Sequence, residues 1–291
     1  DGTITVNPAT LTIVTPDATK VYDGTALTAK GTISGFVNDE TATFETTGTQ
    51  TDVGESSNTW TIAWDGTAKE SNYTISGTTG TLKVTKAKIT EDPEDPDDPS
   101  SKRFTITDPE DTMYNGEEQK QPITIKDNKT GKNLVEGTDF TIEYSDDVTN
   151  VGEVTITITG KGNYDGTIKK TYKITERAVT LTSESASKPY DGTPLTKPTV
   201  KITGDGFVEG EVSDITATGT VTTVAEGEVT NTITYTEGDN FKKDNYTITK
   251  TEGTLKVTEL TDKVTVTITE NSGTEKYDGS EKMVTGYTVS I

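Results

Sequence analysis

Apolar and polar residues alternate one by one in several short stretches of this chain. The segments 154–159 and 264–269 place Val or Ile at every second position, with Thr at the positions between them. A period of two with β-branched residues throughout is the pattern of strands that have one buried face. No stretch carries apolar residues at the helical spacing i, i+3, i+4 and i+7 over three turns. The sequence therefore predicts an almost entirely β protein.

The similar segments 80–84 and 253–257 indicate which way single side chains face. Each has a Leu and a Val two positions apart, with a Lys between them. Neighbouring side chains of a strand point to opposite faces of the sheet. We therefore expect Lys83 and Lys256 to face solvent, and the Leu and Val of each segment to face a core.

A tetrad, Tyr-Asp-Gly-Thr, occurs twice and has two close variants. The four copies are Tyr22-Asp23-Gly24-Thr25, Tyr114-Asn115-Gly116, Tyr190-Asp191-Gly192-Thr193 and Tyr277-Asp278-Gly279-Ser280. Their tyrosines lie 92, 76 and 87 residues apart, and an Asn-Tyr pair follows the first three, at Asn72, Asn163 and Asn245. A closing phrase similar to Gly-Thr-Leu-Lys-Val comes next. Landmarks that recur in the same order at similar spacings indicate tandem modules.

These landmarks give the predicted domain boundaries. They are the tail of a preceding module (1–12), a first module (13–90), an acidic Pro-rich linker (91–102), a second module (103–176), a third module (177–259) and the start of a further module (260–291). The segment 2–6 matches the closing phrase. We therefore expect the chain to be a fragment of a longer protein.

The tetrad, the Asn-Tyr pair and the closing phrase follow one another in the same order in successive modules. This arrangement resembles the YDG and MBG-type repeats, and related Ig-like repeats, of large bacterial surface proteins, mostly from Gram-positive organisms. The second module differs from its neighbours in the segments 136–144 and 159–164. The resemblance implies small Ig-like β-sandwich modules in an elongated array, with β-grasp modules as the alternative. It implies no shared enzymatic activity. A β-grasp module requires a helix, for which the sequence has no pattern.

The tetrad has a local structural explanation. Asp-Gly and Asn-Gly are preferred at the centre of tight hairpin turns, because Gly adopts positive φ without strain. We predict type I′ turns in which Gly24, Gly116, Gly192 and Gly279 have positive φ. The tyrosine of each tetrad is expected to pin its turn to the edge of the core. A ligand site at the tetrad is the alternative.

The segment 91–101 places Pro at every third position among acidic residues. This spacing favours polyproline II, and like charges extend the chain further. A calcium loop of the EF-hand type requires a Gly at its sixth position and a Glu at its twelfth, which this segment lacks. We therefore predict a semi-rigid spacer.

Composition excludes several classes of function. With 48 acidic and 27 basic residues the net charge is −21, which disfavours nucleic acid and anionic lipid as partners. No run of 18 apolar residues exists, so we predict no membrane insertion. The chain has no His and no Cys, which excludes the Ser-His-Asp and Cys-His catalytic arrangements and zinc bound by His or Cys. We predict no catalytic residue, no cofactor and no metal ligand.

Two side-chain chemistries stay open. A Lys–Asn or Lys–Asp isopeptide crosslink requires a buried Lys, and Lys170 is the lysine whose strand parity points inward, together with Ile168 and Tyr172. Trp60 and Trp64 share one strand face, which favours a place in the core over an exposed platform for carbohydrate.

We expect a non-enzymatic stalk or spacer of a bacterial cell-surface protein that presents a distal adhesive domain. The chain would be an extracellular, monomeric extended rod, anchored to the cell wall through regions outside this sequence. In the alternative, the modules themselves bind host mucin glycans or a host surface protein. That alternative requires an exposed aromatic or apolar patch.

Overall fold

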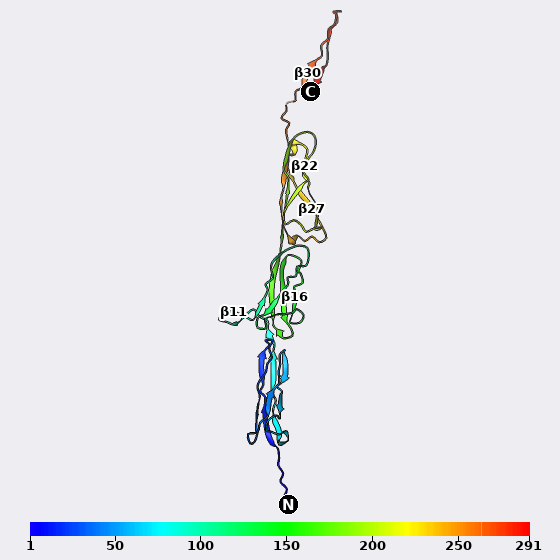
Figure 1. Ribbon diagram of the computed structural model, residues 1–291. Helices are drawn as coiled ribbons and strands as arrows, with labels where there is room; N and C mark the ends of the chain where they lie inside the picture. Colours follow the sequence, from blue (N-terminus) through cyan, green and yellow to red (C-terminus); the bar gives the residue numbers. More distant parts are fainter. Residues whose placement is uncertain (263) are drawn as a thin grey trace. The chain divides into compact units, whose positions relative to one another are not determined.

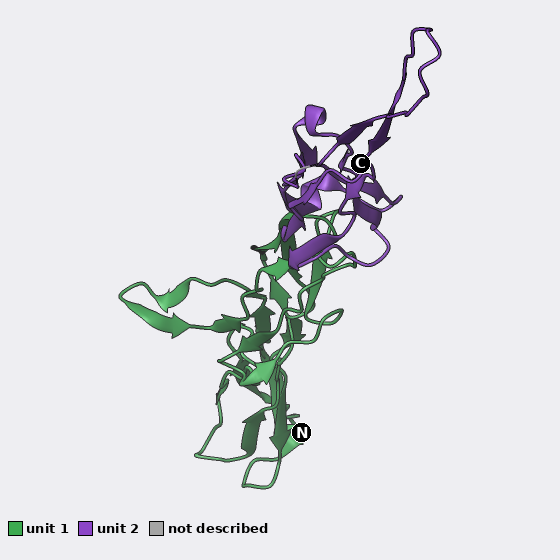
Figure 2. Cartoon of the chain, turned by 90° about the horizontal axis from the view of Figure 1, so that it is seen from above, with its two compact units in different colours: residues 1–175 green, residues 176–291 purple. Residues whose placement is uncertain are grey.

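The computed structural model describes residues 1–262 and 264–291, and it is almost entirely β (Figure 1). The predicted all-β class is confirmed. The helical segments among the described residues are short 3₁₀ turns, η1 (Glu70–Asn72), η2 (Val224–Glu226) and η3 (Lys243–Asn245). The α-helix that a β-grasp module requires is therefore missing from the described part. The chain divides into two compact units, residues 1–175 and 176–291 (Figure 2).

Module one, in the first unit, consists of β1 (Ala9–Val14), β2 (Ala18–Val21), β3 (Thr32–Ser34), β4 (Thr43–Thr46), β5 (Gly54–Ser57), β6 (Trp60–Ala63), β7 (Tyr73–Thr78) and β8 (Thr81–Thr85). These strands form three small sheets, ordered β3-β1-β7, β2-β8-β5 and β4-β6. β1 is parallel to β7, and β2 is parallel to β8. The first stretch of the module therefore pairs with its last stretch.

Module two follows in the same unit. Its strands are β9 (Ala87–Lys88), β10 (Pro93–Asp95), β11 (Asp98–Lys102), β12 (Phe104–Ile106), β13 (Thr112–Met113), β14 (Ile125–Asp127), β15 (Lys132–Asn133), β16 (Phe140–Tyr144), β17 (Gly152–Gly160), β18 (Tyr164–Asp165) and β19 (Thr167–Thr175). The largest sheet has the order β13-β19-β17-β16. β9 pairs in parallel with β18, and β13 pairs in parallel with β19.

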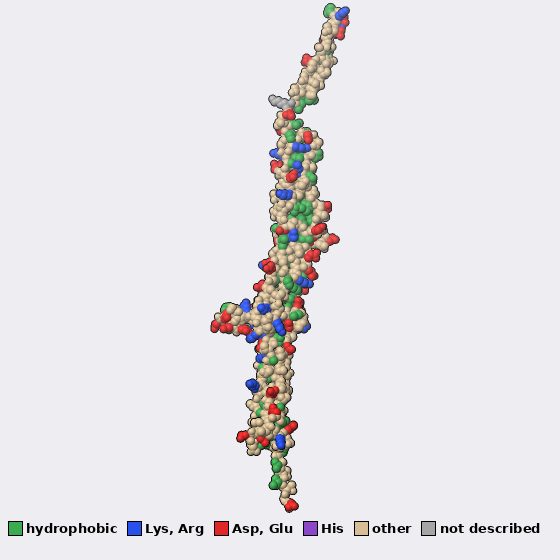
Figure 3. Space-filling view, in the orientation of Figure 1, with side chains coloured by type: hydrophobic (Ala, Val, Ile, Leu, Met, Phe, Trp, Pro, Cys, Tyr) green, Lys and Arg blue, Asp and Glu red, His purple; other side chains and the backbone are tan. Residues whose placement is uncertain are grey.

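The acidic segment forms a hairpin and is not the extended spacer that its prolines predict. β10 and β11 pair antiparallel, and their hairpin projects from the first unit (Figures 1 and 2). Acidic side chains gather on it (Figure 3). Local turns bend the chain back, because the side chains of Asp95 and Asp98 accept hydrogen bonds from the amides of Asp97 and Ser100. Since β9 already belongs to module two, the hairpin interrupts the first stretch of that module.

Module three, in the second unit, repeats the plan of module one. Its strands are β20 (Arg177–Ser183), β21 (Ala186–Pro189), β22 (Leu195–Thr196), β23 (Val200–Gly204), β24 (Val212–Ala217), β25 (Thr220–Val221), β26 (Glu228–Asn231), β27 (Ile233–Glu237), β28 (Tyr246–Thr251) and β29 (Gly253–Thr258). β20 is parallel to β28, and β21 is parallel to β29. A separate hairpin follows, formed by β30 (Thr267–Glu270) and β31 (Tyr287–Ser290).

The core consists of the apolar faces that alternation predicts. In β8, Leu82 and Val84 are buried while Lys83 is exposed, and β29 repeats this arrangement with Lys256 exposed. The apolar positions of segment 154–159 are also buried, in β17. The same prediction is wrong for segment 264–269, whose apolar side chains are exposed. Its hairpin pairs only with itself, so no second layer covers it.

Candidate functional site

The Tyr-Asp-Gly turn of module one is held by hydrogen bonds among Lys20, Asp23 and Thr25, a group that we call the bracket. Asp23 Oδ1 accepts hydrogen bonds from the backbone amide of Thr25 at 2.9 Å and from its hydroxyl at 2.7 Å. Lys20 Nζ lies 2.7 Å from the same carboxylate oxygen. The Lys20 hydrogen bond and the two bonds from Thr25 lower the pKa of Asp23 far below its ordinary value. The turn is therefore fixed by its own residues.

The bracket recurs, but the predicted turn type is wrong. Asp191 accepts the same hydrogen bonds from Thr193 and Lys188, and Asp278 accepts them from Ser280 and Lys282. The four glycines have the expected positive φ, at 76°, 85°, 78° and 82° in chain order. A type I′ turn also requires positive φ at the residue before Gly. Among the described residues other than Gly, only Asn38, Asp39 and Asp214 have it, so these are Asx turns instead.

Tyr22 connects module one to module two. Its ring meets the ring of Tyr164 edge to face, with centroids 5.5 Å apart and an interplanar angle of 83°. Phe104 contacts Tyr164 from another side in a similar T-shaped arrangement, at 6.0 Å. Such edge-to-face pairs are favourable beyond the area they bury. The tyrosine predicted to pin its own module therefore also packs against the next one.

A buried ion pair lies under this aromatic contact. Arg103 Nη2 is 2.9 Å from Asp127 Oδ2, and the two side chains are 8 % and 0 % exposed. The same Nη2 donates to the backbone carbonyl of Tyr22 at 2.7 Å, so the guanidinium spans the module boundary. The hydroxyl of Tyr164 donates to Asp127 Oδ2 at 3.2 Å. Every partner of this pair therefore lies within the joint.

The charge state of Asp127 follows from these contacts. Burial is the largest influence and raises the pKa of Asp127. The hydrogen bond from Arg103 and the backbone amides of Lys129 and Thr130 outweigh burial, so the pKa lies below its ordinary value. Burial, and then the negative charge of Asp127, raise the pKa of the Tyr164 hydroxyl. Asp127 is thus an anion and Tyr164 a neutral donor.

Asn163 clamps the other side of the joint. Its side-chain oxygen accepts from the amide of Val53 at 2.9 Å, and its side-chain nitrogen donates to Asp52 Oδ1 at 3.0 Å. Its backbone carbonyl accepts from the amide of Ala87 at 3.0 Å, where β9 and β18 pair. The Asn-Tyr landmark of module two therefore binds both the end of module one and the connection between the modules.

The other signature tyrosines differ in exposure. Tyr114 is buried, whereas Tyr190 is 42 % exposed and Tyr277 is 96 % exposed. Of the signature tyrosines, Tyr22 contacts a second module through the ring of Tyr164. Sequence reasoning missed Arg103 and Asp127. The bracket could have been predicted from the sequence, because a Lys stands three residues before Asp23 and again three residues before Asp191.

Lys170, the candidate for an isopeptide crosslink, forms ion pairs instead. Its ammonium lies between the carboxylates of Glu91 and Asp108. Burial lowers the pKa of Lys170, but the bonds to Asp108 and Glu91 outweigh it and raise the pKa above its ordinary value. Amide formation needs a neutral amine in a dry site. Asp108 is 81 % exposed, so this arrangement favours a salt bridge.

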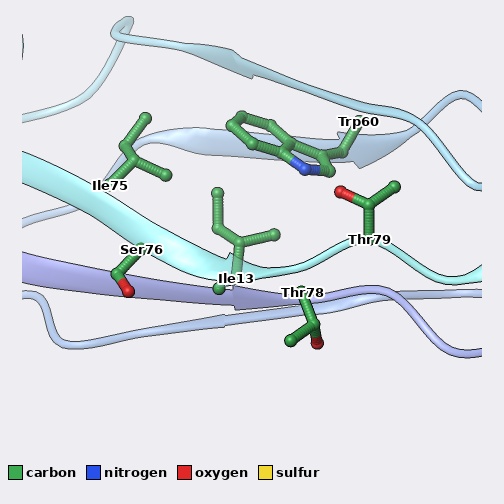
Figure 4. Close-up of a pocket in the computed structure, with 7 residues that line it drawn as sticks. Ile13, Trp60, Ile75, Ser76, Thr78 and Thr79 are labelled. Carbon is green, nitrogen blue, oxygen red and sulfur yellow. The ribbon is translucent and has the colours of Figure 1, made fainter.

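The two tryptophans have different surroundings. Trp64 stacks on Tyr73 at 6.1 Å and packs against the cluster of Leu11, Ala68 and Tyr73. Trp60 is half-buried and borders a shallow groove of about 220 Å³ with Ile13 and β7 (Figure 4). The predicted core position therefore fits Trp64 better than Trp60.

Module three has different residues at the equivalent place. Ile233 replaces Trp60 there and is buried. Lys250 is the equivalent of Gly77, because each stands four residues after the landmark tyrosine of its module. The ammonium of Lys250 donates to the carbonyl of Ile233 at 2.9 Å. The same ammonium lies 4.8 Å from the ring centroid of Tyr235. Module three thus has a lysine side chain over this aromatic ring where module one has Gly77.

Two further classes of site were sought among residues 1–262 and 264–291. No three Asp, Glu, His or Cys side chains in these ranges gather closely enough to hold a metal ion. The described residues contain no helix of sufficient length and hydropathy to span a bilayer.

Comparison with known protein families gives one match. Residues 11–83 match the model of the MBG domain (YGX type), which covers about a quarter of the chain. No curated protein matches the chain. The matched segment contains the Tyr22 turn, Asn72 and most of the closing strand β8. The resemblance to YDG and MBG-type repeats is thereby confirmed, and module one is similar to the MBG domain of the YGX type, a repeat module of surface proteins.

Proposed function

We propose that this chain is a non-enzymatic structural spacer of a bacterial cell-surface protein. Its modules would transmit tension between the cell wall and a distal adhesive domain. The proposal rests on one observation, the parallel pairing of the first and last strands in every module. Module one pairs β1 with β7 and β2 with β8, module two pairs β9 with β18 and β13 with β19, and module three pairs β20 with β28 and β21 with β29.

This pairing puts the two points of chain attachment at opposite ends of two successive parallel ladders, β1 with β7 and β2 with β8. In module one the chain enters at Ala9, which is opposite Tyr73, and leaves at Thr85, which is opposite Val21. Tension between these points shears the paired strands of each ladder past each other. Because shear breaks the hydrogen bonds of a ladder together and not one by one, such a module resists pulling.

The joint supports the same function. A ring contact, the hydrogen bond from Arg103 to the carbonyl of Tyr22, and the hydrogen bonds of Asn163 with residues 52 and 53 cross from module one to module two. A boundary held in this way passes force from one ladder to the next without a slack linker. It also buries the aromatic side chains at the module ends, which leaves fewer exposed apolar patches.

Single-molecule force spectroscopy on the whole chain tests the proposal. Pulled from its two ends, the chain should give one separate high-force unfolding event for each of modules one to three. Forced unfolding is governed by the unfolding barrier and not by equilibrium stability, so thermal melting is no substitute for this measurement. Extension without force peaks would refute the structural role.

One observation favours a second function, direct binding of a host glycan. The Trp60 groove in module one presents an aromatic side chain beside the hydroxyl of Thr79, with no charged side chain in its lining (Figure 4). Aromatic rings beside hydroxyl groups suit a neutral sugar. A glycan array decides between the two functions. Saturable binding that is lost in Trp60→Ala and kept in Trp64→Phe would make the chain an adhesin, whereas no binding leaves the structural role alone.

A further inference from the structure

Two different module ends make the joint between modules one and two. Module one contributes the end that carries the Tyr22 turn, which we call its turn end. Module two contributes the end at which Asn163 and Tyr164 lie beside the start of the module, which we call its Asn-Tyr end. The parallel register there sets Ala87 opposite Tyr164.

Module one has an Asn-Tyr end of the same construction, at Asn72 and Tyr73. Its first strand begins in the same register, with Ala9 opposite Tyr73. In both modules the landmark tyrosine donates its hydroxyl to a carboxylate. The acceptor is Glu40 Oε2 in module one, at 2.6 Å, and Asp127 Oδ2 in module two, at 3.2 Å. The two ends are therefore equivalent surfaces.

The Asn-Tyr end of module one is hollow, where that of module two is filled by Tyr22. A cavity of about 380 Å³ opens there, lined by residues that include Asn7, Ala9, Val37, Glu40 and Asn72. Val37 at this cavity is exposed, although it is a large apolar residue. The surface is thus built like a docking site and lacks the side chain that fills the equivalent site.

Residues 2–6 indicate what fills it. They repeat the closing phrase of 80–84, and they stand at the same distance from the module that follows. Val6 precedes Ala9 by three residues, and Val84 precedes Ala87 by three residues. The Leu and Val of 80–84 are buried, while Ile4 and Val6 are 89 % and 86 % exposed. Apolar side chains at alternate strand positions need a core on one face.

The backbone places the missing turn beside the cavity. In modules one, two and three the amide of the signature tyrosine donates to the last residue of the closing strand, at 2.9 Å each time. The pairs are Tyr22 with Thr85, Tyr114 with Thr175 and Tyr190 with Thr258. The residue equivalent to Thr85 after the phrase at 2–6 is Asn7. Asn7 lines the cavity, so a turn bonded to it lies against Asn72.

We propose that the cavity beside Asn72 is a docking site for the Tyr-Asp-Gly turn of a preceding β module of the same polypeptide, whose closing strand is residues 2–6. The tyrosine ring would lie against Tyr73 as Tyr22 lies against Tyr164, and Asn72 would clamp the neighbouring loop as Asn163 does. Segment 7–12 has no Arg to take the place of Arg103. This joint is therefore weaker than the one between modules one and two.

The inference rests on the tandem-module function proposed above, and its test measures docking without applying force. Residues 9–79 are duplicated in front of residues 2–291, so that segment 2–6 continues the copied module as its closing strand. Hydrogen exchange is measured by mass spectrometry over 2–6, 37–40 and 71–72. Exchange at all three segments should be about tenfold slower or more in the extended chain.

Two substitutions make the test specific. Replacing the copied Tyr22 by Ala should restore fast exchange at 37–40 while 2–6 stays protected. Asn72→Ala should raise exchange at 37–40 in the extended chain and leave it unchanged in the original chain. Asn163→Ala, at the filled joint, is the matched control and should raise exchange at 52–53 in both chains.

A second prefix, residues 177–252, repeats the test with the turn of Tyr190. The proposal is overturned if 2–6 becomes protected while 37–40 exchanges as before, because the module then forms without docking. It is equally overturned if neither prefix protects 2–6, because those residues then do not complete such a module. Loss of force resistance alone would instead refute the structural function and leave docking intact.

Discussion

Replacing Arg103 by Met tests the buried ion pair together with the hydrogen bond that Arg103 makes across the joint. Met keeps much of the apolar stem and removes the charge, so Asp127 is left buried without its partner. Breaking a buried pair by removing one member costs roughly 3–5 kcal/mol. The lost hydrogen bond to the carbonyl of Tyr22 adds about 1 kcal/mol. For a module of this size, 3 kcal/mol corresponds to a fall in the melting temperature of roughly 12–24 °C.

The same variant also predicts how the difference in stability between variant and wild type changes with pH. In the wild-type protein the pKa of Asp127 is lowered on folding. Its contribution to stability is therefore present above the ordinary carboxyl pKa and is lost as pH falls through the lowered value. Without Arg103, burial is the main remaining influence and raises the pKa of Asp127 above that of the unfolded chain. The variant should therefore recover stability relative to wild type as pH falls from 7 towards 4.

Urea denaturation at pH 7 and at pH 4.5, followed by fluorescence and by hydrogen exchange in 103–175, measures both effects. The double variant Arg103→Met with Asp127→Leu removes both charges and should recover much of the loss. Lys83→Met is the surface control, because the pair of Lys83 with Glu55 is exposed and contributes at most about 1 kcal/mol. A loss below about 1 kcal/mol for Arg103→Met, or a deficit that grows at low pH, would refute the reasoning.

Three further perturbations have expected outcomes. Gly192→Val should destabilise module three by about 1–2 kcal/mol, because φ is 78° there and the added side chain meets no neighbour. Gly24→Val should in addition loosen the joint, because its added Cβ meets Thr130 Cγ2 at 3.1 Å. Thermal melts measure the loss of module stability, and hydrogen exchange measures the loosening of the joint. Gly77→Ala should cost module one about 3 kcal/mol or more in urea melts, because the new Cβ would stand 1.7 Å from the carbonyl oxygen of Ile13; an unchanged melt contradicts that geometry. Calcium and NaCl at equal ionic strength should raise the melting temperature of this chain of net charge −21 by similar small amounts in calorimetry, and a large effect of micromolar calcium alone would reveal a specific site.

Alternation along the chain predicted the buried faces of strands β8, β17 and β29, but not the exposure of segment 264–269. Lys83 faces solvent between buried Leu82 and Val84, because neighbouring side chains of a strand point to opposite faces and the Lys stands between two apolar residues. Positive φ at the signature glycines was also predictable, since it depends on local chemistry. The turn type was not, because the carboxylate of Asp23 takes the place of a backbone partner.

Long-range pairing accounts for what the sequence could not show. The parallel register of β1 with β7 joins residues about sixty positions apart, and no local pattern encodes the partner of a strand. Arg103 and Asp127 are 24 positions apart, and nothing in the residues around either one marks them as partners. The acidic segment was misjudged because local prolines favour extension, whereas the turn at Asp95 and Asp98 brings its two halves together.

Pulling one module in two directions tests the proposed mechanical role most directly. Because the chain has no Cys, paired cysteine substitutions provide unique attachment points. Pro8→Cys with Lys86→Cys loads module one in shear, along its parallel ladders, whereas Pro8→Cys with Ser71→Cys peels β1 from β7 at one end. We predict an unfolding force several-fold higher in shear than in peeling. Equal forces in the two directions would contradict the account.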